Sequence, residues 1–268
     1  MFSYGFEMAW ADKKDARFHA SELQVPKARV LDEKFWLLWG DDPEPSMREK
    51  IIFVSIDDLG RVGPSTFNVK LVCDALGVSY SLINHHFGNR DELIAEAVVR
   101  AYANYVEVLW AAAKSAKRTP EARLRAWLEA SLEWSREFSG LGALLNYPTA
   151  SLDVTFLIRE KWEPTLNDWG ELNLARLLRL VKDYRSDTVS DQIVEIGNVP
   201  RAHLLADAKA TMAMASVGWA LLGLAVWGAG KHLPSGNVPE AKAREKIARR
   251  YHLDNIMQLA KGKVILED

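Results

Sequence analysis

Four polar side chains fall on one side of a very short predicted helix. They are Tyr80, Ser81, Asn84 and His85, at offsets of one, four and five residues, which places them on one helical face. Each can donate or accept hydrogen bonds. No nucleophile accompanies the imidazole at the spacing that catalysis would need. The pattern therefore predicts recognition of another polar surface by hydrogen bonding.

Turn signals on both sides define the helix that presents this face. Gly77 is expected to end the preceding helix, because glycine adopts the left-handed backbone conformation at little steric cost. Ser79 supplies an N-cap and Gly88 ends the short helix. Residues 80–86 are too few to form a stable helix alone, so packing must hold it. The residues available for that packing are Leu82, Ile83 and Phe87.

The neighbouring helices are also marked by their ends. Hydroxyl groups at residues 64–66 predict the start of a helix that ends near Leu76. Asn89 and Glu92 form a capping pair for a further helix that begins at about Asp91. Two short helices joined by a tight glycine turn are typical of a helix-turn-helix unit.

The block resembles the DNA-binding domain of the tetracycline-repressor (TetR) family of bacterial transcription regulators. In that family an amphipathic helix precedes the pair, and here a capping box at Ser46 and Glu49 begins one that ends between residues 60 and 63. The resemblance covers roughly residues 46–99 with its spacing intact. The matching residues are Leu71, Gly77, Val78, Ser79, Ile83, His86, Phe87, Asn89, Arg90 and Leu93.

The resemblance implies roles for individual residues. Tyr80 and Ser81 would face base edges in the major groove, and Asn84 and His85 would reach bases or phosphates one turn further on. Family members usually carry tyrosine at the position of Asn84, and that tyrosine touches a phosphate. The residues that would grip the sugar-phosphate backbone are Asn68, His86 and Arg90.

The predicted DNA-binding unit has no net positive charge. Residues 47–100 contain six lysines and arginines against seven aspartates and glutamates. Because neutralised phosphates supply much of the affinity for DNA, we expect binding to weaken only gradually with salt. The cations available for phosphate contacts are Arg48, Lys50, Lys70 and Arg90.

Length and composition predict a helical protein of about two units with an added N-terminal segment. The chain has 268 residues, 49% of them hydrophobic, and a formal net charge of -2. We expect an all-α fold with an extension at 1–45, a helix-turn-helix domain at 46–99 and a ligand-binding and dimerisation domain at 100–268. The single Cys73 excludes an intrachain disulfide, and charges replace the apolar run of a signal peptide. Both features favour a cytoplasmic protein.

The C-terminal part is rich in aromatic residues at helical spacing. Thr119 and Pro120 predict the start of a helix that Gly140 and Gly142 should break. In TetR-like proteins this domain encloses a pocket for a small-molecule inducer, and aromatic walls suit a flat or apolar ligand. Ordinary core packing is the alternative for each ring. The candidate pocket residues are Trp127, Trp134, Phe138, Trp162 and Met212.

Residues 210–230 carry no charge and could either span a membrane or be buried between subunits. Their many small residues favour a helix covered on one side by its own domain and on the other by a second copy of the chain. The resemblance implies the same homodimer, whose two reading helices would lie about one DNA turn apart on a palindromic operator. The candidate interface residues are Leu177, Met214, Val217, Leu221 and Leu224.

Other functional classes find little support in the sequence. No phosphate-binding loop, nucleophile elbow or zinc-binding HExxH pair is present, so neither an enzyme nor a cofactor is predicted. Acidic residues recur every four positions, at Asp183, Asp187, Asp191 and Glu195, and we interpret them as a solvated helix face instead of a metal site. We predict a ligand-responsive repressor. The alternative is a helical ligand-binding or membrane-associated protein whose helix-turn-helix no longer binds DNA.

Overall fold

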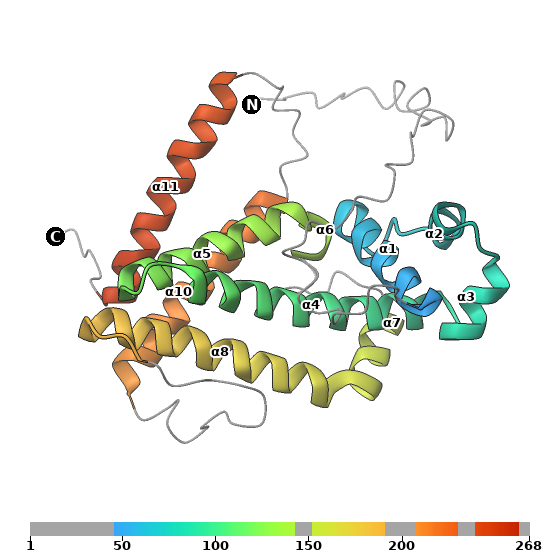
Figure 1. Ribbon diagram of the computed structural model, residues 1–268, viewed down its shortest axis with the longest axis horizontal. Helices are drawn as coiled ribbons and strands as arrows, with labels where there is room; N and C mark the ends of the chain where they lie inside the picture. The colour runs from blue at the N-terminus through green and yellow to red at the C-terminus, as the bar shows by residue number, and fades with distance from the viewer. Residues whose placement is uncertain (1–45, 143–151, 191–206, 230–238, 263–268) are drawn as a thin grey trace, which may run out of the picture.

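The computed structural model describes residues 46–142, 152–190, 207–229 and 239–262 (Figure 1). Helices and the turns that join them make up these residues, and no strand occurs among them. The predicted all-α class is therefore confirmed. The expected N-terminal extension, residues 1–45, lies outside the described residues.

Three short helices form the unit at one end of the molecule. They are α1 (Met47–Val62), α2 (Val69–Leu76) and α3 (Tyr80–Phe87). The Ser46 hydroxyl accepts the amide of Glu49 at 3.3 Å, and the Ser79 hydroxyl accepts the amide of Leu82 at 3.3 Å. Gly77 adopts the left-handed conformation, with a φ angle of 65°. The predicted caps at Ser46 and Ser79 and the glycine turn at Gly77 are thus confirmed.

The α2 helix begins later than predicted. Its N-cap is Asn68, whose side-chain oxygen accepts a backbone amide of α2 at 3.0 Å. The preceding residues form a turn in which the amide of Phe67 donates to the carbonyl of Gly63 at 3.1 Å. The carbonyls of Pro64 and Phe67 accept from the guanidinium of Arg90, so they are engaged outside any helix.

The α4 helix (Arg90–Ser115) joins this unit to the rest of the chain without interruption. It has 26 residues and crosses the boundary expected between residues 99 and 100. Figure 1 shows α5 and α8 lying along it. The remaining elements are α5 (Pro120–Glu137), α6 (Ser139–Gly142), α7 (Leu152–Leu157), the π-helical turn η3 (Ile158–Trp162), α8 (Glu163–Ser186), α10 (Ala208–Ala229) and α11 (Pro239–Lys261).

The break expected at Gly140 and Gly142 takes a different form. The α5 helix ends at Glu137, and the two glycines belong to the four-residue helix α6. Gly140 lies directly against the end of α1, where a Cβ atom would come within 2.3 Å of the carbonyl oxygen of Leu59. The glycine is needed for close approach of two backbones.

The hydrophobic core is continuous between the N-terminal unit and the helices that follow. Ile52 and Leu59 of α1 share one cluster with Trp134 of α5 and with Phe138. A second cluster lies further from α3 and joins α4, α5, α8, α10 and α11. Tyr105 of α4 packs against both clusters. We call the helices from α5 onward the body. Because packed side chains connect the body to α1, a displacement of the body can be transmitted to α1.

The acidic face expected on α8 is not solvated at Asp183. This carboxylate is buried, accepts the amide of Ser190 at 2.9 Å and lies 3.9 Å from the Arg123 guanidinium. Burial of a carboxylate requires such partners. Asp187 is exposed and follows the last residue of α8, whereas residues 191 and 195 lie outside the described residues. No metal-binding cluster occurs in the described part of the chain.

The α10 helix turns a different side toward the core from the one predicted. Val217 and Leu221 are buried among the other helices of the same chain, as is Leu177 of α8. Met212 and Trp219 are 72% and 73% exposed. No helix in the described segments is long and apolar enough to cross a membrane. The outward face of α10 thus consists of residues other than the predicted interface residues. Two of those predicted residues, Met214 and Leu224, are partly buried.

Candidate nucleic-acid interface

The α3 helix is held outward by its apolar side. Ile83 is 1% exposed, and both Ile83 and Phe87 pack in the cluster shared with α1 and α4. Gly88, with a φ angle of 84°, ends the helix. Because eight residues cannot form a stable helix alone, this packing fixes both the existence and the direction of α3.

The opposite side of α3 carries the predicted polar face. Tyr80 is 51% exposed, and Ser81, Asn84 and His85 are also exposed. The hydroxyl groups of Ser79 and Ser81 lie 2.8 Å apart, so one donates to the other at the start of the helix. The structure thus brings the four predicted polar side chains together on one accessible helix face.

The three residues predicted to grip the DNA backbone occupy different environments. Asn68 is exposed, and its side-chain oxygen caps α2, which leaves its amide group facing solvent. His86 is partly exposed, and its ring lies 5.4 Å from that of His85 in an edge-on arrangement. Arg90 is partly buried and makes internal hydrogen bonds to the turn before α2.

Several predicted phosphate-binding cations are engaged within the protein. Arg48 forms two parallel bonds to Glu96, at 2.8 and 2.6 Å, and its guanidinium lies 4.8 Å from the centre of the Phe87 ring. Its hydrogen bond to Glu96 raises the pKa of Arg48. Lys50 and Lys70 remain exposed on α1 and α2. Two of the four candidate cations, Arg48 and Arg90, are therefore engaged internally, and the expected shallow salt dependence stays a prediction.

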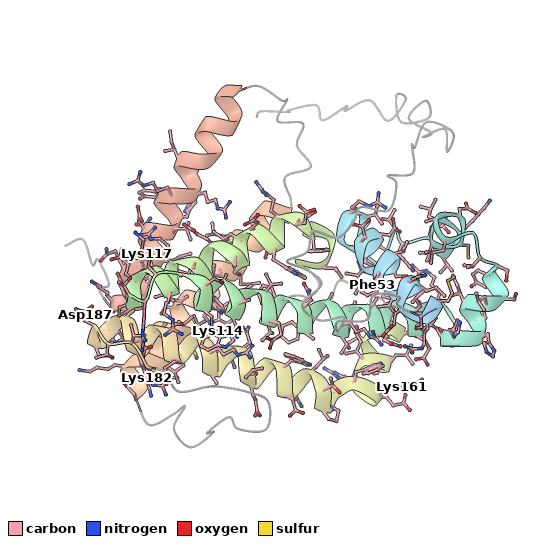
Figure 2. All side chains as sticks on the ribbon, in the orientation of Figure 1. Phe53, Lys114, Lys117, Lys161, Lys182 and Asp187 are labelled. Carbon is pink, nitrogen blue, oxygen red and sulfur yellow. The ribbon has the colours of Figure 1, made fainter. Side chains whose placement is uncertain are left out.

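Another ion pair joins η3 to the start of α4, directly after the helix-turn-helix unit. The ammonium of Lys161 in η3 contacts the carboxylate of Glu92 in the first turn of α4. Figure 2 labels Lys161 beside the junction of these elements. Because Glu92 lies two residues after the start of α4, the contact ties η3 to the end of the helix-turn-helix unit.

The five predicted pocket residues do not form one group. Trp134 and Phe138 are buried with ring centres 4.8 Å apart, and Trp162 packs against the same cluster. Trp127 belongs to the second cluster, and its indole N–H has no hydrogen-bond partner among the described residues. Met212 lies on the outward face of α10. A site that uses these rings would therefore centre on Trp134, Phe138 and Trp162.

Polar groups that sequence reasoning missed line the same interior. The Trp134 indole donates to the side-chain oxygen of Asn104 at 2.9 Å. The hydroxyls of Tyr105 and Ser131 lie 2.8 Å apart, and burial raises the pKa of Tyr105 to about 12. Ser131 lies within the apolar stripe of α5. In the sequence, a hydroxyl at such a position indicates that it has a buried hydrogen-bond partner.

Comparisons with known proteins found one relative that is named as a helix-turn-helix regulator. No protein-family model matches the chain. The chain is 27% identical over 143 residues to the HTH-type transcriptional regulator BetI of Burkholderia thailandensis, a match that covers 50% of this chain and 67% of that protein. A crystal structure of a protein assigned as a transcriptional regulator in Pseudomonas aeruginosa PAO1 aligns over 79% of this chain and 93% of its own, with 22% identity and a TM-score of 0.39.

Proposed function

We propose that this protein is a DNA-binding transcriptional regulator that inserts α3 into the major groove. The observation that carries the proposal is the division of α3 into a buried apolar side and an exposed side with four hydrogen-bonding residues. Such a helix can meet base edges without first unfolding from the body. The similarity to a protein named as an HTH-type transcriptional regulator supports the same function.

The proposed DNA-binding form is a homodimer on a palindromic operator. One eight-residue helix reaches few base pairs, whereas a twofold dimer presents two such helices. The outward face of α10 is the surface we propose for the contact, because it exposes the large apolar residues Met212 and Trp219. Gly223 is exposed on the same helix and would permit close approach of a partner backbone.

The proposed regulation is release from DNA when a small apolar or aromatic ligand enters the body near Trp134, Phe138 and Trp162. Phe138 lies against α1, since a Cβ atom on Gly60 would come within 2.5 Å of the Phe138 ring. A ligand that displaces Phe138 would therefore act directly on α1. Release would follow if the ligand bound more tightly to a conformation whose α3 spacing does not fit DNA. Under this proposal the protein acts as a repressor that the ligand releases from DNA.

Selection of bound fragments from random DNA by the full-length chain tests the DNA-binding proposal. We expect a palindromic consensus, and Tyr80→Ala and Asn84→Ala should each weaken binding to it by about 5- to 150-fold, the range of one lost base contact. Lys114→Ala is the matched control, because Lys114 is exposed near the end of α4 far from α3 (Figure 2). Enrichment of no sequence, or unchanged binding by both α3 variants, would contradict the proposal.

The regulatory part is tested with Trp134→Ala. This variant should bind the selected operator but respond differently to a panel of aromatic compounds that releases the native protein, because the variant lacks one of the two indole rings of the proposed site. Equal release of the native protein and of the variant by every active compound would show that the ligand binds elsewhere.

A further inference from the structure

Arg90 joins the two ends of the helix-turn-helix unit. It is the first residue of α4 and follows α3, whereas the two backbone carbonyls that it contacts precede α2. One terminal nitrogen donates to the carbonyls of Pro64 at 2.8 Å and Phe67 at 3.2 Å, and Nε donates to Phe67 at 3.4 Å. The other terminal nitrogen contacts Asp91 at 3.0 Å. Four of the five guanidinium N–H groups are thus directed into the protein.

The segment that Arg90 holds determines where α2 begins. Phe67 is buried in the core, and the Arg90 guanidinium lies 5.8 Å from the centre of its ring. The amide of Phe67 donates to the carbonyl of Gly63 at the end of α1 at 3.1 Å, and the next residue, Asn68, caps α2. The turn is therefore fixed from one side by α1 and from the other by Arg90.

We propose that Arg90 is a positioning residue for DNA binding, not a phosphate ligand. By bonding the residues just before α2 from a residue just after α3, it sets the angle of both helices relative to α4. A phosphate could engage the guanidinium fully only if the Pro64 and Phe67 carbonyls lost their bonds, which is costly for partly buried groups. This inference rests on the proposed function, because it assigns Arg90 a part in DNA binding.

The planar guanidinium is required for this role. Its N–H groups lie in a fixed plane and can bridge two carbonyls, whereas a lysine ammonium is a single point of charge. Arg90→Lys therefore keeps the charge that a phosphate contact needs but loses the bridge. Arg90→Gln loses both. Lys70→Gln is the comparison, because Lys70 is an exposed cation on α2.

The test measures the affinity of the full-length variants for the selected operator and for a scrambled duplex, at several salt concentrations from about 50 to 200 mM. We expect Arg90→Lys and Arg90→Gln to lose about tenfold in operator affinity alike, with scrambled-duplex affinity and the salt dependence of operator binding unchanged. Lys70→Gln should instead lower the slope of log affinity against log salt by about 0.9.

Hydrogen exchange adds a measurement that needs no DNA. Backbone amides of residues 67–76 should exchange faster in Arg90→Lys than in the native protein, while those of α5 should be unchanged. Circular dichroism establishes a temperature at which every variant is fully folded, and the binding measurements are made there.

Three results would overturn the inference. Near-normal operator binding by Arg90→Lys, with a reduced salt slope for Arg90→Gln, would identify Arg90 as a phosphate ligand. Normal affinity of both variants once folded would reduce its role to stability alone. If the native protein binds no duplex, the proposed function fails and the inference fails with it. Binding data for the native protein alone distinguish this outcome from failure of the inference about Arg90.

Discussion

Gly140 of α6 and Gly63 at the end of α1 lie in direct backbone contact. A Cβ atom on Gly140 would come within 2.5 Å of the Gly63 nitrogen and 2.3 Å of the Leu59 carbonyl oxygen. Both distances are shorter than side-chain atoms tolerate against backbone. The contact joins the helix-turn-helix unit to the body at a point remote in sequence, so it depends on a residue without a side chain.

Gly140→Ala should therefore destabilise the protein by about 1–3 kcal/mol, because backbone must move to admit the methyl group. It should also lower operator affinity, since α1 would shift relative to the body. The control is Gly170→Ala in α8, where the nearest atom to a new Cβ is the Tyr102 hydroxyl at 3.7 Å. That variant should be stabilised by about 0.5–1 kcal/mol. Urea denaturation measures both changes, and equal effects would contradict this account.

Asp58 predicts a component of stability that depends on pH. Its burial raises the pKa of its carboxyl above the ordinary 3.8, and the nearby Arg61 only partly opposes this effect. The folded state therefore binds the proton more tightly than the unfolded state does. This contribution to stability is present below the ordinary pKa and is lost as pH rises through the raised pKa.

Asp58→Asn should remove that loss, so the unfolding free energy of the variant should fall less between about pH 4 and pH 7 than that of the native protein. Asp74→Asn, a change at an exposed carboxyl of α2, serves as the control and should follow the native curve. A steeper pH dependence in Asp58→Asn than in the native protein would refute the assignment.

The hydrogen bond between Tyr105 and Ser131 should contribute measurably to the stability of the body. Tyr105→Phe and Ser131→Ala should each cost about 0.5–1.5 kcal/mol, and the double variant should lose less than the sum, because the two hydroxyls share one bond. The folded-state pKa of Tyr105 of about 12, against an ordinary 10, adds a pH effect. Stability present below pH 10 should decline toward pH 12 in the native protein and decline less in Tyr105→Phe. Additive losses would show that the hydroxyls are independent.

Trp219→Glu should convert a homodimer to monomers if the outward face of α10 forms the interface. A charge at a residue that is 73% exposed in the single chain costs nothing before association and becomes buried on association. Sedimentation velocity measures the mass of each variant. Leu174→Glu, at a half-exposed apolar residue of α8, should leave the mass unchanged. A dimer that survives Trp219→Glu would place the interface elsewhere.

Local signals determined the helix-turn-helix unit from the sequence alone. Caps at Ser46, Ser79 and Asn89 and the left-handed Gly77 depend on contacts between residues at most a few positions apart. Their outcome is nearly independent of the rest of the chain. The apolar spacing of α3 likewise predicted which side would be buried and which four polar residues would be exposed.

Only the tertiary structure decided which apolar side chains are buried and which residues far apart in the sequence contact one another. A helix with almost no charged residues, such as α10, has no charged side to mark its exterior, so neighbouring helices determined that Val217 is buried and Trp219 is exposed. The start of α2 depended on Arg90, a residue more than twenty positions away, because its guanidinium engages the carbonyls that an earlier helix start would have used. The continuous core from Leu59 to Trp134 also required contacts across the chain. The sequence specified the shape of each local element, whereas long-range packing specified how the elements face one another.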